Sequence, residues 1–381
     1  MHNDTAVRVS TMPPPSSAPH IAEWFKVLIF IALTFTFFVG TVGNILVVHI
    51  IRKRKQKRSI HLLTLNLAAS DLIVLLIYLP MQMYTIHTEL EWHFGKSLCR
   101  VSYSVNSCSV NASIGTLVAI TRDRYVAVMD PIVAHKRATT FIKYWIIIIW
   151  SFSVIITVPL TAVVDAKVHH TMMICTEYWP NPNYENIYWI SVFVLQFVLP
   201  LIFIAASYAI ILVQLQKAQT PNELVCLNNN NEDRNFASSR RITKRKKQQS
   251  RRLKMSVVLV VAYAICVLPQ HSVFFATTYG NLGTKSYGIL IFITSNFLML
   301  LNSALNPVIY GTLNDEMKRG FLKMLCCEKY SLLESFRSSF QRLRLRKRTT
   351  TTESNTTNTS LSPRKTSVQF DITPVTRIDN L

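Results

Sequence analysis

Charged residues are scarce in this chain: Asp, Glu, Lys and Arg make up only 16% of its 381 residues, against about 25% in a typical soluble domain. Glycine is scarce as well, with 9 residues, and no glycine-rich nucleotide-binding loop of the GxxxxGK[ST] or GxGxxG kind occurs. The 7 cysteines are odd in number and too dispersed for a disulfide scaffold. These absences argue against a soluble enzyme and against a disulfide-rich domain.

Long uncharged runs are what the chain has instead, and half of its residues are hydrophobic. A hydrocarbon core about 30 Å thick requires roughly 20 apolar residues of helix. Several runs contain proline, which membrane helices tolerate because neighbouring groups satisfy the freed carbonyls. The pattern predicts an all-α membrane protein with seven spanning helices, at residues 27–51, 62–87, between 100 and 122, 144–164, 186–216, 255–284 and 286–314.

The distribution of basic residues between these spans predicts their orientation. Cytoplasmic loops carry an excess of Lys and Arg. One side of the predicted bundle holds 35 of the 41 basic residues, and the other holds Arg8, Lys26, Lys96, Arg100, Lys167 and Lys285. The amino terminus is therefore expected outside and the carboxyl terminus inside, in the plasma membrane. The outer segment carries an Asn-Asp-Thr sequon at Asn3, a glycosylation acceptor.

Short motifs occur in order along the spans: Gly43-Asn44-Ile45-Leu46-Val47, Asn66-Leu67-Ala68-Ala69-Ser70-Asp71, Asp123-Arg124-Tyr125, Trp150, Pro200 with Tyr208, and Asn306-Pro307-Val308-Ile309-Tyr310. Any one of them arises often by chance, whereas the ordered set is specific. The chain resembles a rhodopsin-like (class A) G-protein-coupled receptor over residues 25–327. The resemblance implies a seven-transmembrane helix bundle at 25–313, after an extracellular segment at 1–24.

The inner ends of the helices match the part of the family that couples to heterotrimeric G proteins. The resemblance assigns this role to Asp123, Arg124, Tyr125, Tyr208 and Tyr310. The alternative for Arg124 is an interfacial arginine that extends to the cytosol. Helix six begins Gln248-Gln249-Ser250, without the carboxylate that would pair with Arg124. We therefore expect no ion lock between helices three and six, and appreciable basal activity.

Helix six also departs from the family pattern. Val267 stands where most relatives have a tryptophan beneath the ligand, and Tyr263 stands where they have phenylalanine. Because valine is far smaller than an indole, either neighbours fill the space or water reaches further inward. We expect Tyr263 to be the main packing switch. The resemblance gives the complete set of switch positions as Ile114, Pro200, Tyr263, Val267, Pro269, Asn306 and Pro307.

Asp71 lies in the middle of a span, where a charged group costs at least about 2.5 kcal/mol and marks function by default. The alternative is a protonated structural Asp that is hydrogen-bonded between helices. In the family, the corresponding cluster binds a sodium ion that stabilises the inactive state. The resemblance assigns such a site to Asp71, Ser113, Asn302, Ser303 and Asn306, and no other cofactor is expected.

Two cysteines, Cys99 and Cys175, fall on the predicted outer side, an oxidising compartment. A disulfide between them is expected, and two free thiols are the alternative.

The ligand class is narrowed by two positions. Asn106 replaces the Asp by which amine receptors of the family bind an ammonium group, and Leu300 replaces the Schiff-base lysine of retinal proteins. The remaining resemblance is to the peptide branch, of the neuropeptide Y, neuropeptide FF, orexin and tachykinin kind. Family positions that turn inward give a candidate pocket of Gln82, Asn106, Glu177, Gln196, His271, Phe274, Phe292 and Asn296.

Alternatives to a peptide receptor are a receptor for a non-peptide small molecule and, more remotely, a transporter or channel. A transporter is expected to show internal repeats, and none is found. The chain contains neither the HExxH motif nor the GxSxG elbow by which an intramembrane enzyme would be recognised, so no enzyme activity is expected. The acids of the outer loops fit a basic peptide. The alternative is that these acids are ordinary residues of hydrophilic loops.

The inner face carries most of the charge of +21. The third inner loop, 217–249, contains a basic run suited to anionic membrane lipid, and the spans exclude nucleic acid. Apolar residues recur every four positions in 314–327, which predicts an amphipathic juxtamembrane helix with candidate palmitoylation sites at Cys326 and Cys327. The tail, 328–381, is rich in Thr and Ser and is expected to be disordered. Its composition suits receptor kinases and then arrestin.

Overall fold

The computed structural model describes residues 21–54, 58–130, 132–133, 139–169, 171–217, 232–280, 282 and 287–325. Asn3, Cys326, Cys327, the tail and most of the first half of the third inner loop lie outside these residues. The modifications expected at those positions therefore stay predictions.

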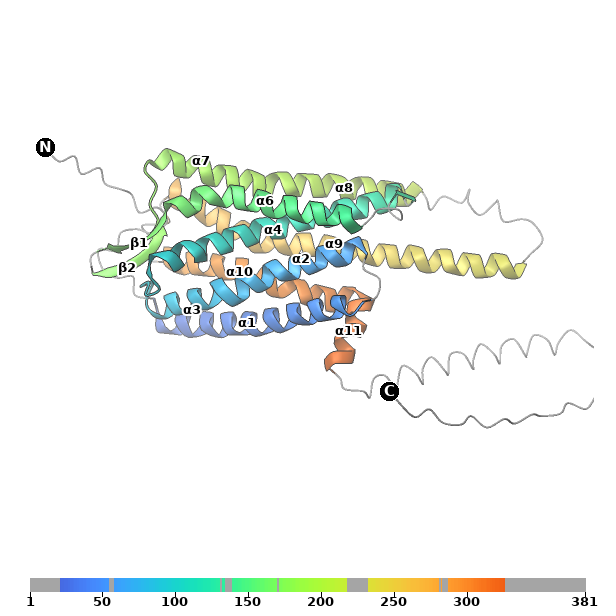
Figure 1. Ribbon diagram of the computed structural model, residues 1–381, viewed down its shortest axis with the longest axis horizontal. Helices are drawn as coiled ribbons and strands as arrows, with labels where there is room; N and C mark the ends of the chain where they lie inside the picture. The colour runs from blue at the N-terminus through green and yellow to red at the C-terminus, as the bar shows by residue number, and fades with distance from the viewer. Residues whose placement is uncertain are drawn as a thin grey trace, which may run out of the picture. The chain divides into compact units, whose positions relative to one another are not determined.

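Seven membrane helices lie side by side in the described part of the chain (Figure 1). Six have the length and apolar composition to cross a membrane, and the seventh, the third in order, is 35 residues long and richer in Ser and Asn. This confirms the predicted all-α bundle. Its helices are α1 (Glu23–Arg52), α2 (Ser59–Ile73) with α3 (Leu79–His87), α4 (Gly95–Met129), α6 (Thr139–Val163), α7 (Pro182–Phe193) with α8 (Leu199–Lys217), α9 (Glu232–Thr278) and α10 (Gly288–Leu313).

Two of these spans contain a single widened turn just before a proline. The π-helical turns are η1 (Val74–Tyr78), before Pro80, and η2 (Val194–Val198), before Pro200. Proline has no backbone N–H and its ring collides with the carbonyl four residues earlier, so the helix cannot continue with regular hydrogen bonds at that point. The widened turns therefore lie where the sequence places the prolines.

The segment between α6 and α7, which carries Cys175 of the predicted outer side, forms a hairpin. Strand β1 (Val164–His169) pairs antiparallel with β2 (Met172–Glu177), with Val164 opposite Glu177 and Ala166 opposite Cys175. The hairpin lies at the end of the bundle where α1 begins (Figure 1). It forms the outer cover of the helices around the candidate pocket.

Helix α9 starts earlier than the sequence suggested. Residues 232–249, predicted as part of a loop, continue the helix of the sixth span without interruption. At the other end, α9 stops at Thr278 rather than near residue 284. The chain then enters α10, and the predicted amphipathic helix is observed as α11 (Asp315–Leu325).

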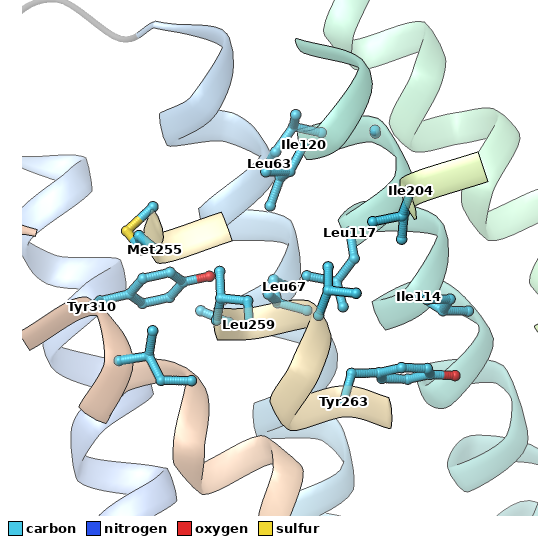
Figure 2. Packing of buried hydrophobic residues seen from close by; sticks show 14 of the residues in the cluster. Leu63, Leu67, Ile114, Leu117, Ile120, Ile204, Met255, Leu259, Tyr263 and Tyr310 are labelled. Carbon is cyan, nitrogen blue, oxygen red and sulfur yellow. The ribbon is translucent and has the colours of Figure 1, made fainter. Parts of the chain in front are cut away.

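The inner half of the bundle is packed by a continuous apolar core. Figure 2 shows Tyr310 beside Met255 and Leu259, and Tyr263 lower in the view than Ile114, within the same cluster. Helices α1 and α10 approach closely: a Cβ atom added at Gly43 would lie 2.6 Å from the Pro307 ring. Only glycine fits at that contact, which brings the inner ends of the two helices together.

Candidate functional site

A disulfide connects the first turn of α4 to β2. Cys99 and Cys175 are bonded, as predicted, and their separation in the chain is 76 residues. Cys99 is fully buried among Trp92, Leu160 and Val164. The bond therefore fixes the hairpin against the top of α4, directly above the helices that carry the candidate pocket.

We expect Cys99→Ser and Cys175→Ser each to lower surface expression, because either change releases a loop of about 76 residues that is closed in the native chain. Flow cytometry of a tagged receptor measures this. The double variant should be no worse than either single variant, since both remove the same bond. Additive loss would mean that the two thiols act separately.

Glu177, the last residue of β2, is a buried carboxylate with two indole donors. Only 3% of its surface is exposed. Its Oε2 accepts hydrogen bonds from Trp179 Nε1 at 2.7 Å and from Trp189 Nε1 at 3.0 Å. The Trp189 ring also contacts the ring of Phe274, 5.5 Å away centre to centre. Trp189 thus links two residues of the predicted pocket, Glu177 and Phe274.

Burial raises the pKa of the Glu177 carboxyl from 4.5 to about 7. The two indole hydrogen bonds oppose this shift, and the nearby carboxylate of Glu185 reinforces it. Tyr103 and Tyr188 lie close enough to Glu177 for electrostatic interaction. The outer end of the bundle therefore contains an acid whose charge changes near neutral pH.

Because the folded pKa of Glu177 is raised, the folded state binds more protons than the unfolded state between pH 4.5 and about 7. Stability should therefore rise as the pH falls through this window, by on the order of 3 kcal/mol for the complete shift. Thermal unfolding of the purified receptor at pH 5 and pH 8 measures this. Glu177→Gln should weaken the pH dependence and raise the midpoint at pH 8.

The matched control is Glu23→Gln, at a carboxylate whose side chain is 74% exposed. This change should leave the pH dependence as it is in the wild type. An equal loss of pH dependence in both variants would contradict the assignment to Glu177.

The predicted pocket residues divide between two small cavities and an aromatic cluster. One cavity, with room for about one water molecule, is lined by Asn106, Ser109, Val267 and Asn302, among others. A second lies between α1, α3 and α10 and is lined by Gln82, Phe292 and Asn296 together with apolar residues. His271 packs against the rings of Phe193 and Phe197, which stack on each other. These positions form the outer half of the bundle interior.

The side chain of Gln196 is bonded to another side chain rather than facing an open cavity. Its Nε2 donates to Asn111 Oδ1 at 3.1 Å, a bond from η2 to α4. Its backbone carbonyl accepts the Tyr263 hydroxyl at 3.2 Å. Pro200, four residues on, has no N–H to give that carbonyl. Tyr263, which is completely buried, thus satisfies an acceptor that the proline leaves free.

Asp71 and its predicted partners converge in the middle of the bundle. Asn306 Nδ2 donates to Asp71 Oδ2 at 2.8 Å, which joins α10 to α2. Ser113 Oγ lies 3.0 Å from Ser70 Oγ. The second carboxylate oxygen of Asp71 and the Oδ1 of Asn302 accept no hydrogen bond from any described residue, although both are buried.

These oxygen atoms are suitable ligands for a small hard cation. One carboxylate with neutral amide and hydroxyl oxygens is the chemistry that such cations prefer. Ser113, Asn302 and Ser303 also line the cavity that contains Val267. Val267 therefore borders a small cavity that also touches residues of the Asp71 cluster.

At the inner end, Arg124 bonds to its neighbour in the chain. Arg124 Nη2 donates to Asp123 Oδ2 at 2.8 Å, and Arg124 is only 9% exposed. Tyr208 and Tyr310 are buried in the same core. Among the described side chains, no carboxylate of α9 pairs with Arg124. Tyr125 is partly buried beside this core.

Sequence reasoning missed three contacts. One is the pair of hydrogen bonds from two indoles to Glu177, for which the only signal in the sequence was the two tryptophans that follow β2, at positions 179 and 189. Another is a chain of bonds from Trp150 Nε1 to Asn66 and from Asn66 to Thr116, at 2.9 and 2.8 Å. The last is an ion pair between Arg251 of α9 and Asp315 of α11.

Comparison with known proteins identifies the family. A model described as "7 transmembrane receptor (rhodopsin family)" matches residues 43–310. The neuromedin-K receptor of Oryctolagus cuniculus is 29% identical over 287 residues, which are 74% of this chain and 58% of that receptor. The substance-P receptor of Aquarana catesbeiana is 29% identical over 84% of this chain and 74% of its own length. Galanin receptor 2a of Danio rerio is 26% identical over 80% of each.

The aligned part of this chain covers less than two thirds of the neuromedin-K receptor. The family match, by contrast, extends from the glycine that packs on Pro307 to Tyr310, through every membrane helix. The matched region holds the disulfide, the Asp71 cluster and the enclosed Arg124 described above. This multi-pass membrane protein belongs to the rhodopsin family of seven-transmembrane receptors.

Proposed function

We propose that this protein is a plasma-membrane receptor for an extracellular peptide and activates heterotrimeric G proteins. The observation that carries the proposal is what lies at the two ends of α4. Its outer half lines a cavity through Asn106, and its inner end holds the enclosed Arg124. One helix therefore extends from the candidate pocket at the outer side to the arginine assigned to G-protein coupling at the inner side.

A peptide is favoured over other ligands by both chemistry and relatives. The α4 helix has no carboxylate near Asn106 for an amine, and α10 has no lysine for retinal. The relatives named above are receptors for neuromedin K, substance P and galanin by their names. The peptide is expected to carry a basic group, since the buried acids Glu177 and Glu185 lie at the outer end of the bundle.

The test is a library of amidated peptides applied to cells that express the receptor with a promiscuous G protein. We expect at least one peptide to stimulate signalling, and cells without the receptor are the control. A response to a non-peptide small molecule and to no peptide would overturn the peptide assignment. Solute flux without nucleotide exchange would favour a transporter.

The role of Glu177 can be tested with a pair of peptides that differ in one charge. Citrulline is a neutral analogue of arginine. If an active peptide contains arginine at the contact, citrulline should lower its potency on the wild type and have little effect on Glu177→Gln. Equal loss on both receptors would place the basic group elsewhere.

Sodium is expected to act through the Asp71 cluster, with Ser113, Asn302, Ser303 and Asn306 supplying neutral oxygens. We expect Asp71→Asn to remove any sodium dependence of agonist affinity, because Asn supplies no full charge. Couplings of this kind change affinity about fivefold or more. Binding measured in sodium chloride and in choline chloride at equal ionic strength tests this. An unchanged sodium response in the variant would count against the cluster.

The cytoplasmic segments are expected to regulate the signal. Receptor kinases would phosphorylate the Thr- and Ser-rich tail, and the added charge would recruit arrestin. Palmitoylation of Cys326 and Cys327 would anchor the end of α11 to membrane lipid. Glycosylation at Asn3 would mark the outer side.

A further inference from the structure

The inner end of α9 packs on the residues around Arg124: Tyr208 lies close to both Ser256 of α9 and Arg124. Leu253, Met255 and Leu259 of α9 are buried in the core that also contains Tyr208 of α8 and Tyr310 of α10. A cytosolic protein cannot reach a side chain that is 9% exposed unless a neighbouring element moves. This apolar packing holds the end of α9 in place together with any polar contact that α9 makes, and Arg124 itself is bonded to Asp123 of its own helix.

The contact that α9 does make is with α11. Arg251 Nη1 is hydrogen-bonded to Asp315 Oδ2, and the two residues are 64 positions apart in the chain. Arg251 is one turn before Met255, so the ion pair lies at the innermost part of the described α9 side chains. Both side chains are about half exposed, at 49% and 58%, so water and salt can reach the pair.

The first turn of α11 is a suitable anchor because it is itself held in place. Asn314 Oδ1 accepts the backbone N–H groups of Glu316 and Met317, which caps the helix. Glu316 forms an ion pair with Arg54 after α1. A Cβ atom added at Gly320 would lie 2.8 Å from Ile50, so α11 packs closely on α1.

We propose that the Arg251–Asp315 ion pair is an autoinhibitory contact that holds the inner end of α9 closed over Arg124. It connects α9 to α11, in place of a lock between α9 and α4. The inference rests on the proposed function, since closure matters only if a G protein must reach Arg124. An exposed pair stabilises by at most about 1 kcal/mol, which corresponds to a shift of about two- to fivefold.

The variants are Arg251→Gln and Asp315→Asn, which each remove one charge, and the exchange Arg251→Asp with Asp315→Arg. Two controls make matched charge changes: Lys254→Gln on the exposed face of α9, and Glu316→Gln, which changes the contacts of α11 with Arg54 and His61 but not the one with Arg251. All are prepared as full-length receptors in lipid nanodiscs.

The first measurement is hydrogen exchange in the inner turns of α9, which needs neither ligand nor G protein. Each single variant should accelerate exchange about two- to fivefold, and the charge-exchanged variant should return toward the wild type. Unchanged exchange in both single variants, or additive acceleration in the exchanged pair, overturns the contact.

The second measurement is basal nucleotide exchange on purified G protein. It should rise by the same factor in the single variants and fall back in the exchanged pair, with neither control changed. Salt should raise basal exchange of the wild type but not of Asp315→Asn, since screening weakens an exposed pair. If the variants alter hydrogen exchange but neither they nor the wild type stimulates nucleotide exchange, the proposed function is overturned. Nucleotide exchange that is equal in all receptors would overturn the inference alone.

Discussion

Replacing Arg124 with alanine is expected to abolish nucleotide exchange on the G protein while leaving peptide binding intact. Arg124 lies at the inner end of α4, far along the helix from Asn106, and is not among the residues that line the two cavities described above. Its guanidinium offers planar donors that no other residue type supplies. Arginines at the centre of protein interfaces typically contribute about 2 kcal/mol or more, so we expect at least about a thirtyfold loss.

The matched control is Arg122→Ala, two residues earlier on the same helix. Arg122 lies over the rings of Phe141 and Trp145, 5.4 and 5.0 Å from their centres. It therefore faces α6, away from the core that covers Arg124, and its loss should leave most of the exchange rate. Peptide affinity and surface expression are measured in parallel. Normal exchange by Arg124→Ala at normal expression would remove Arg124 from its assigned role.

The membrane spans and the family motifs were predictable because each is encoded locally. A run of about 20 uncharged residues has few alternatives to a membrane helix. The α4 helix is less apolar than the others, and its prediction relied on the spacing between Arg100 and Arg122 and on the alternation of basic loops. The contact of Asp71 with Asn306 followed from matched motif positions, and the bond between Cys99 and Cys175 followed from their shared place on the outer side.

Contacts between distant segments without a motif could not be predicted. The hairpin brings Glu177 to Trp189, and nothing in the spacing of 12 residues specifies that both indoles reach one carboxylate oxygen. The pairing of Arg251 with Asp315 depends on where α11 turns after α10. Gln196 was assigned to the pocket from its family position, yet its amide is bonded to Asn111. Such side-chain partners are decided by the packing of helices rather than by local sequence.

The buried tyrosine of α9 offers the second large effect. Tyr263 is completely enclosed and packs in one core with Ile114, Leu259 and Val267 (Figure 2). Its hydroxyl donates to the Gln196 carbonyl in η2, next to the Pro200 kink. The side chain thus connects the helix that must move at its inner end with α4 and η2 near the outer cavities. Val267, one turn above, is too small to make this connection.

We expect Tyr263→Ala to reduce signalling much more than peptide binding. Removing a buried aromatic ring costs about 3–5 kcal/mol and leaves a cavity, so motion at the outer end would no longer be transmitted along α9. Agonist binding and nucleotide exchange, each normalised to surface expression, measure the two effects. Tyr263→Phe keeps the ring and removes only a hydrogen bond worth about 1 kcal/mol. It should therefore retain more signalling than the alanine variant.

These two variants separate the ring from the hydroxyl. If Tyr263→Phe and Tyr263→Ala lose signalling equally, the hydroxyl bond to Gln196 is the essential part of the switch. If only the alanine variant loses signalling, the packed ring is the essential part of the switch. If both keep wild-type binding and signalling while Val267→Ala alone uncouples the receptor, Tyr263 is not the switch. The small residue at 267, which borders the polar cavity next to the Asp71 cluster, would then be the position through which the two ends of the bundle communicate.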